Sequence, residues 1–421
     1  MRVLFVFDGS LTKERSGPAI RCWELAQVIA EQHEVTVATS QKSDLQADHI
    51  SLRSDVAQNR TLLRQLARDH DVVVTQGLVL TKCPFLRGAA KFLVVDLYDP
   101  YLLEYLAHPH PRLPELGFLR QLHSVNRQLM QADFILCANE RQKDHWLGAL
   151  GALGRLDPSQ YARDPSLNDL VGVVPFGMPS QPPRKQRSAL RDAIPAIFPD
   201  DTVLLWAGGI WDWLDPLVII RAVGEISKTR SDIKLVFLGT RDPNPNNRTM
   251  SMLERCKAEA KAMRVLDETV IFLEGWAPYD ERQNYLLDAD IGVSAHPDTI
   301  ESRFSFRTRI LDYLWAGLPM IVSQGDGWSG YISDKRLGMA VPMGDVAAWQ
   351  AAIPALADDL NERAAIRRRS VALAPNFHWK TTAAPLVEYC NHPYRGNSVP
   401  RIRQLLAPAM VRLFESWRRL R

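Results

Sequence analysis

The chain has 421 residues, 46% of them hydrophobic, and a formal net charge of +3 at pH 7. This length accommodates two domains, and the small net charge argues against a protein that binds nucleic acid. The five cysteines lie far apart, without metal-site spacing, and are expected to be reduced thiols of a cytoplasmic protein. No run approaches the ~18 to 20 apolar residues of a membrane span, and the start has too few for a signal peptide. We therefore expect a protein that is soluble or peripheral to a membrane.

Strand and helix patterns alternate along the first half of the chain. Short β-branched or aromatic runs, of the kind found in buried parallel strands, predict strands over 3–7, 35–38, 72–75, 92–95, 134–138 and 171–174. Helical patterns lie between them, notably over 19–31 and 141–150. A polar, proline-rich segment at 179–187 then follows and is the best candidate for a linker.

The alternation restarts after this linker. Strands are predicted over 203–206, 234–238, 270–273 and 291–295, with helices over 216–227, 250–263 and 280–288. Two successive arrays of this kind predict an α/β fold with two doubly wound, Rossmann-like domains, over 1–180 and 188–378. In such domains ligands bind beyond the carboxyl ends of the strands, so a cleft between the domains is the expected site.

Three strand ends in the second half carry residues suited to a nucleotide. Gly208 and Gly209 follow the first strand, and paired glycines let backbone amides approach a phosphate closely. Arg241 follows the second strand, and Trp276 the third, where a loop or an aromatic ring could hold a base. A merely tight turn at the glycines and a packing role for Trp276 are the alternatives.

The segment 301–319, ESRFSFRTRILDYLWAGLP, predicts a helix with one polar face that carries Ser305, Arg309 and Asp312. A helix start with Arg307 and Arg309 suits a diphosphate. The carboxylate of Asp312 could accept the two hydroxyls of a ribose. The alternative is an ordinary amphipathic helix whose arginines are solvated.

These segments together resemble the retaining glycosyltransferases of the GT-B fold, especially family 4, glycosyltransferase group 1. The sequence LDYLWAGLP at 311–319 is similar to the second half of the family motif, with Asp312 at the acid that binds the ribose. Gly17 and Arg21 stand where the family has a glycine-rich loop facing the reaction centre. The resemblance covers nearly the whole chain.

The resemblance implies an enzyme that transfers a hexosyl or related sugar from a nucleotide diphosphate-sugar to an acceptor, with retention. The implied acceptor is a glycan, a lipid-linked sugar or a polysaccharide precursor, bound on the first domain, with the donor on the second. No metal or other cofactor is implied. A sugar-nucleotide epimerase, a cyclitol-transferring relative and a non-catalytic sugar-nucleotide-binding protein are the alternatives.

The chain departs from the family pattern at three places. Phe304 stands where the first of two acids usually lies, and the nearest acid is Glu301. The arginine and lysine that usually follow the first strand of the nucleotide domain are absent, so Arg307 and Arg309 are expected to supply these cations. A histidine usual after the fourth strand of the first domain is replaced by 96–99. There Asp99 or Asp96 contacts the donor sugar or acceptor, or else caps the next helix.

The complete site prediction combines the residue patterns and the resemblance. Catalytic roles are assigned to Asp99, Glu301 and Arg309, nucleotide-sugar binding to Gly208, Gly209, Arg241, Trp276, Ser305, Arg307 and Asp312, and an acceptor-side loop to Gly17 and Arg21.

The last residues form a separate, basic segment. Residues 391–421 contain seven arginines and one acid, and apolar residues repeat at helical spacing after Pro408. Residues 379–421 are expected to be helices that cross back to the first domain. A basic amphipathic helix also suits an anionic membrane surface, so peripheral contact with the inner face of a membrane stays open.

Overall fold

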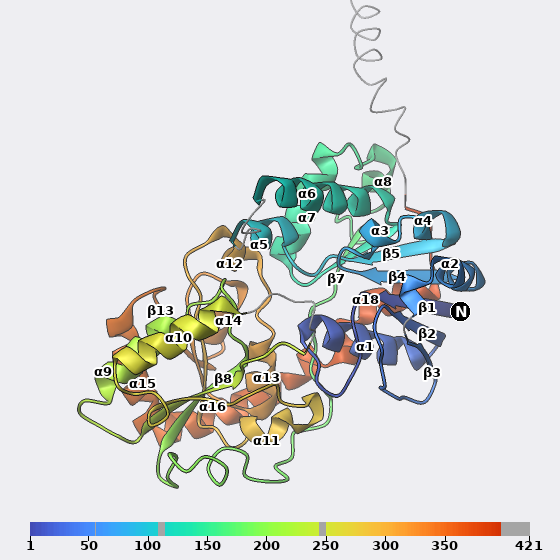
Figure 1. Ribbon diagram of the computed structural model, residues 1–421. Helices are drawn as coiled ribbons and strands as arrows, with labels where there is room; N and C mark the ends of the chain where they lie inside the picture. Colours follow the sequence, from blue (N-terminus) through green and yellow to red (C-terminus); the bar gives the residue numbers. More distant parts are fainter. Residues whose placement is uncertain (55, 108–113, 244–249, 397–421) are drawn as a thin grey trace, which may run out of the picture.

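A computed structural model describes residues 1–54, 56–107, 114–243 and 250–396 (Figure 1). Each half of the chain is built around a parallel sheet, as the alternating pattern predicted. The seven strands of the first sheet have the order β3-β2-β1-β4-β5-β6-β7, and the six strands of the second have the order β10-β9-β8-β11-β12-β13. Both sheets are therefore doubly wound, with the strand order reversing beside β1 and β8.

The first sheet consists of β1 (Arg2–Phe7), β2 (Glu34–Thr39), β3 (Ile50–Arg53), β4 (Val72–Gln76), β5 (Phe92–Asp96), β6 (Phe134–Cys137) and β7 (Val171–Val173). The helices of this half are α1 (Gly17–Ala30), α2 (Arg60–Asp69), α3 (Val79–Lys82), α4 (Leu86–Ala89), α5 (Tyr101–Ala107), α6 (Pro114–Gln131), α7 (Glu140–Ala152) and α8 (Pro158–Arg163), with a 3-10 turn at Val56–Gln58. Strand β3 was not predicted, because this short edge strand is only half buried and lacks a continuous apolar run.

The second sheet consists of β8 (Thr202–Gly209), β9 (Ile233–Gly239), β10 (Val270–Phe272), β11 (Ile291–Ser294), β12 (Met320–Ser323) and β13 (Gly338–Val341). Its helices are α9 (Pro216–Ile226), α10 (Ser251–Ala262), α11 (Arg282–Leu286), α12 (Ile300–Phe304), α13 (Arg309–Ala316), α14 (Gly327–Asp334), α15 (Val346–Asp358) and α16 (Leu360–Leu373). The helix predicted over 280–288 is instead a 3-10 turn, Tyr279–Glu281, followed by the short α11.

The helix predicted from residue 301 is interrupted. Ser305 ends α12 in an extended conformation, and α13 begins only at Arg309. Phe306 lies between them, stacked on Phe176 of the first domain and edge-on to Trp328. This packing draws the chain out of a continuous helix. Ser305 therefore does not share the polar face of Asp312, contrary to the prediction.

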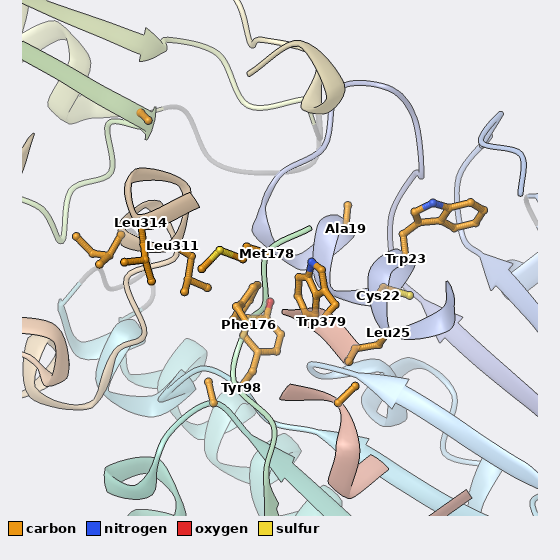
Figure 2. Close-up of a cluster of buried hydrophobic side chains, with 14 of the residues drawn as sticks. Ala19, Cys22, Trp23, Leu25, Tyr98, Phe176, Met178, Leu311, Leu314 and Trp379 are labelled. Atoms are coloured by element: carbon orange, nitrogen blue, oxygen red, sulfur yellow. The ribbon is translucent and has the colours of Figure 1, made fainter. Parts of the chain in front are cut away.

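A buried apolar cluster joins the two halves. Figure 2 shows α13 side chains on one side, α1 side chains on the other, and Phe176, Met178 and Trp379 between them. The chain crosses back here through the 3-10 turn Ala374–Phe377 and α17 (Trp379–Thr382), and α18 (Ala384–Asn391) then stacks Tyr389 on Phe134 of β6. The two domains are thus held by a common core on this side. The domain limits stay a prediction, and the helix expected after Pro408 lies outside the described residues.

Within the described residues, no helix combines the length and the apolar composition needed to cross a bilayer.

Candidate active site

A cavity of about 760 Å³ lies between the two domains at the carboxyl ends of their strands. Eight of the predicted site residues line it: Gly17, Asp99, Gly208, Gly209, Trp276, Arg307, Arg309 and Asp312. The other four, Arg21, Arg241, Glu301 and Ser305, are absent from its walls. This position is the one expected for a ligand in doubly wound sheets.

The two glycines after β8 differ in what surrounds them. Gly208 has a φ of +108°, and a β-carbon built on it would meet nothing within 4 Å. A β-carbon on Gly209 would instead lie 2.4 Å from Nε1 of Trp211, whose indole covers that residue. Gly208 is therefore the position where backbone is open to a ligand in the cavity, and its conformation is one that side chains rarely adopt.

We expect Gly208→Ala to lower both the melting temperature and the affinity for a nucleotide diphosphate. The added side chain strains the backbone by about 1 to 3 kcal/mol, which the loop relieves by moving away from the ligand. Calorimetric binding and thermal melting measure the two effects. Gly330→Ala inside α14 is the control, because its β-carbon also meets nothing within 4 Å and alanine suits a helix. Equal behaviour of the two variants would contradict this role of Gly208.

Arg309 is a buried cation that lacks an acidic partner among the described residues. It begins α13, and its side chain is 9% exposed. Nη2 donates to the carbonyl oxygen of Gly209 at 3.1 Å, and the guanidinium lies 4.1 Å from the ring centre of Trp206. Nη1 is buried and has no hydrogen-bond partner in the described structure. Burial lowers the pKa of Arg309 to about 10. An anion in the cavity would complete this site.

Arg307, by contrast, is already neutralised. Its Nη2 lies 2.9 Å from the carboxylate of Glu301, and both side chains are buried. Ser305 donates its hydroxyl to the same carboxylate. The predicted catalytic role of Glu301 and the ligand contact of Ser305 are therefore not supported by their positions, because both are absent from the cavity wall and bond to each other or to Arg307. Arg307 itself lines the cavity, and its buried Nε has no hydrogen-bond partner in the described structure. The interruption between α12 and α13 is what brings Arg307 back onto Glu301.

Asp312 lines the cavity and is oriented by a residue that the sequence did not reveal. Nε of Arg282 donates to its Oδ1 at 2.9 Å. The Arg282 guanidinium lies between two rings, 3.5 Å from the centre of Tyr279 and 4.5 Å from that of Trp315, and it also donates to the carbonyl oxygen of Tyr279 at 2.6 Å. Only the folded chain brings the partners together, because Arg282 lies 30 residues before Asp312. Arg282 is a positioning residue for this carboxylate.

Trp276 links the two domains at the edge of the cavity. Its Nε1 donates to the carbonyl oxygen of Arg15 at 3.1 Å, and the backbone N–H of Tyr279 donates to the carbonyl oxygen of Lys13 at 2.9 Å. Trp276 thus has a packing role in addition to its place in the wall. Arg241 is exposed and lies outside the wall, where Asp242 takes its place, so the expected ligand contact of Arg241 is not supported.

On the first domain, Gly17 begins α1 and lines the cavity, whereas Arg21 lies behind the wall. Arg21 is 0% exposed and donates from Nε and Nη2 to both oxygens of Asp96, at 2.7 and 2.8 Å. Its guanidinium also supports the rings of Tyr98 and Phe176, which do line the cavity. The position of Arg21 indicates support of the wall and not direct contact with an acceptor.

Asp99 opens into the cavity beside Tyr98 and Tyr101. Burial, followed by the nearby charge of Glu301, raises the pKa of Asp99 to about 7. This carboxyl group therefore changes its charge close to neutral pH. No group of three or more His, Cys, Asp or Glu side chains placed to hold a metal ion occurs within the described ranges.

Comparison with known proteins agrees with this architecture. Residues 201–359 match the family model described as glycosyl transferases group 1. The chain is 27% identical over 263 residues to the D-inositol 3-phosphate glycosyltransferase of Acidothermus cellulolyticus, covering 61% of this chain and 54% of that protein. It thus spans about half the length of the curated relatives it matches.

Two solved structures share the fold over most of the chain. The sucrose-phosphate synthase of Thermosynechococcus elongatus superposes with a TM-score of 0.68 at 14% identity, covering 93% of this chain and 98% of that one. Anabaena HepE in complex with UDP-glucose superposes with a TM-score of 0.67 at 15% identity, covering 93% and 99%. The chain therefore has the GT-B fold, which confirms the predicted fold, and residues 201–359 are similar to the glycosyl transferases group 1.

Proposed function

We propose that this protein is a retaining glycosyltransferase of family 4, which moves a sugar from a nucleotide diphosphate-sugar to an acceptor. The observation that carries the proposal is the unpartnered, buried Nη1 of Arg309 at the wall of the cavity. A buried guanidinium with a free N–H and no acidic partner among the described residues suits an anion, and the open backbone of Gly208 lies in the same wall. The diphosphate of a donor meets both requirements.

The remaining groups of the second domain suit the rest of the donor. Asp312 lies on the same helix as Arg309, one turn further along, with its carboxylate fixed by Arg282. It would accept hydrogen bonds from the two ribose hydroxyls, and the base would then lie against Trp276 and Ala277, which line the same cavity. The HepE neighbour, solved with UDP-glucose, adds support for a nucleotide-sugar ligand in this fold.

The reaction needs no protein base in this arrangement. The bond between the sugar and the diphosphate breaks as the acceptor oxygen bonds to the same carbon on the same face, and the acceptor proton passes to the leaving diphosphate. Negative charge grows on that leaving group toward the transition state, where Arg309 would stabilise it. The proposed reaction uses no metal or other cofactor. We further propose that the enzyme acts in the cytoplasm, on a glycan or lipid-linked acceptor in polysaccharide synthesis.

A panel of nucleotide diphosphates, screened by thermal shift, tests the donor site, because a bound ligand raises the melting temperature by mass action. Turnover of the matching nucleotide-sugars then tests the reaction. Release of nucleotide diphosphate that depends on an added acceptor supports transfer. Isomerised donor without release would indicate an epimerase, and binding without any chemistry would indicate a sugar-nucleotide-binding protein.

We expect Asp312→Ala to weaken nucleotide binding by about 1.5 to 3 kcal/mol, because charge-assisted hydrogen bonds to the ribose are lost. Titration calorimetry with the nucleotide identified in the screen measures this loss. Asp334→Ala, which removes an exposed acid from the end of α14, is the control and should bind like the parent. If a folded Asp312→Ala variant binds as tightly as the parent, the ribose assignment is wrong.

A further inference from the structure

The first-domain wall of the cavity is acidic and rich in hydroxyl groups. Its polar residues include three tyrosines, three acids and a glutamine: Tyr98, Tyr101, Tyr105, Asp8, Asp99, Glu104 and Gln121. Among the described residues of this wall, Arg15 is the one cation, and its side chain is 4% exposed and lies 3.4 Å from Asp280. The donor-side wall carries three arginines, Arg282, Arg307 and Arg309, together with three acids, Asp212, Asp242 and Asp312, and of these arginines Arg309 has no ion pair within the described residues.

Asp99 is the acid of this wall whose charge has no ion-pair partner in the described structure. Two complete buried ion pairs flank it, Arg21 with Asp96 and Arg307 with Glu301. Asp8 differs, because Lys82 contacts it at 2.5 Å. Above about pH 7 the carboxylate of Asp99, beside the hydroxyl of Tyr98, therefore presents a negative charge without an ion-pair partner in the described structure to whatever fills this half of the cavity.

The hydroxyl group of Tyr101 is a second polar group of this wall that a ligand could contact. The hydroxyl of Tyr101 is buried, lies beside that of Tyr98 and has no other hydrogen-bond partner within the described structure. Burial raises the pKa of this hydroxyl well above its ordinary value, so it stays neutral and able to donate or accept. A ligand with several hydroxyl groups can satisfy both Tyr101 and Asp99, whereas a phosphate would meet a like charge at Asp99.

We propose that the acceptor is a sugar or polyol that meets the first domain through hydroxyl groups and carries no phosphate or carboxylate there, and that Asp99 enforces this choice. The proposal rests on the transferase function and adds the chemical class of the acceptor. Asp99 is thus a specificity residue for the acceptor. The hydroxyl groups of the acceptor donate to its carboxylate, and anionic analogues are repelled.

Matched acceptor pairs test this selection. Protein saturated with its nucleotide diphosphate is titrated with glucose, mannose or myo-inositol and with the monophosphate of each, and binding is followed by saturation-transfer NMR. Transfer rates with the intact donor are measured for the same pairs. We expect each neutral member to be favoured about tenfold at about pH 8 or above, where Asp99 is ionised, and only about twofold near pH 7, where the carboxyl group can take up a proton at little cost.

Asp99→Asn removes the negative charge of the side chain and keeps its shape, so it tests whether the charge causes the preference. The variant should lose most of this preference while keeping the affinity for nucleotide diphosphate, because the donor lies on the other wall. Asp212→Asn is the control, since it removes an acid from the donor-side wall and should leave the preference between acceptors unchanged.

The pH dependence gives a readout that a structural role for Asp99 would not produce. The groups around Asp99 are Tyr98, Tyr101, Glu104, Arg21 of α1, Asp96 of β5 and Glu301 of α12. Glucose is compared with glucuronate, whose carboxylate stays ionised across this range, whereas a phosphate monoester itself titrates near pH 6. The preference for glucose should shrink as the pH falls through about 7 in the parent, because Asp99 takes up a proton, and should stay flat in Asp99→Asn.

The outcomes are distinguishable from failure of the proposed function. A protein that binds no nucleotide diphosphate refutes the transferase proposal itself. If it binds nucleotide but prefers the phosphorylated or uronate members, or binds no neutral member of the panel, the inference about the acceptor is overturned while the donor site stands. An unchanged preference in Asp99→Asn would remove Asp99 from its role.

Discussion

Arg309→Met is expected to weaken diphosphate binding strongly without lowering the stability of the free protein. A pKa of about 10, where 12.5 is ordinary, means that the buried guanidinium costs the folded state on the order of 3 kcal/mol. Because the pKa is lowered, this cost is fully present below pH 10 and is relieved only as the pH rises from there toward 12.5. Methionine removes the charge and keeps much of the volume.

The loss should be specific to the diphosphate. Removing one member of a buried charge pair typically costs about 2 to 5 kcal/mol of binding, whereas binding of the bare nucleoside has no such contact to lose. Calorimetry with the nucleoside and with its diphosphate measures the difference, and thermal melting of the free protein measures stability. Equal losses for the two ligands, together with a lower melting temperature, would mean that Arg309 serves packing alone.

Arg307→Met is the matched control and should behave in the opposite way. It leaves Glu301 buried and without its cation, which typically destabilises a protein by about 3 to 5 kcal/mol. Arg307 and Arg309, separated by one residue, would then contribute to the stability of the free protein with opposite signs. Arg309 lowers the stability and serves a ligand, whereas Arg307 stabilises the fold. A stable Arg307→Met variant would contradict this division.

The sequence analysis assigned both Arg307 and Arg309 to the diphosphate, because it could not detect the break in the helix that separates them. Residues 303–312 carry a pattern compatible with a single helix, in which Ser305, Arg309 and Asp312 share a face. The break between α12 and α13 depends on Phe306 packing against Phe176, far away in the chain. Arg309 and Asp312 kept their predicted relation because both lie on α13, whereas Ser305 and Arg307 lie before it.

The fold was predictable to a larger extent than the site. Buried parallel strands need continuous apolar runs, so alternation with helices was visible over residues 3–295, and two doubly wound domains followed. Edge strands such as β3 lack that signal. Partners in the site are set by tertiary contacts: Arg21 reaches Asp96 across 75 residues, and Arg282 reaches Asp312 across 30. Spacing along one helix cannot reveal such pairs.

The second large effect, on the stability of the protein, is expected when the buried ion pair of Arg21 and Asp96 is broken. Arg21→Met is expected to destabilise the protein by about 3 to 5 kcal/mol, because it leaves a carboxylate that is 2% exposed without its cation. Adding Asp96→Asn should restore much of this loss, since the uncompensated charge is then gone. The pair Lys91 and Asp71 at the surface is the control, and Lys91→Met should cost less than about 1 kcal/mol.

Chemical denaturation of the four proteins measures these differences, and the acceptor assay shows their consequence for the site. Arg21 supports the rings of Tyr98 and Phe176 in the cavity wall, so the single variant should also weaken acceptor binding. The double variant should regain stability but not the full affinity, because the guanidinium under those rings is still missing. If Arg21→Met were as stable as the parent and impaired only in acceptor binding, Arg21 would be a contact residue, as the family resemblance implied.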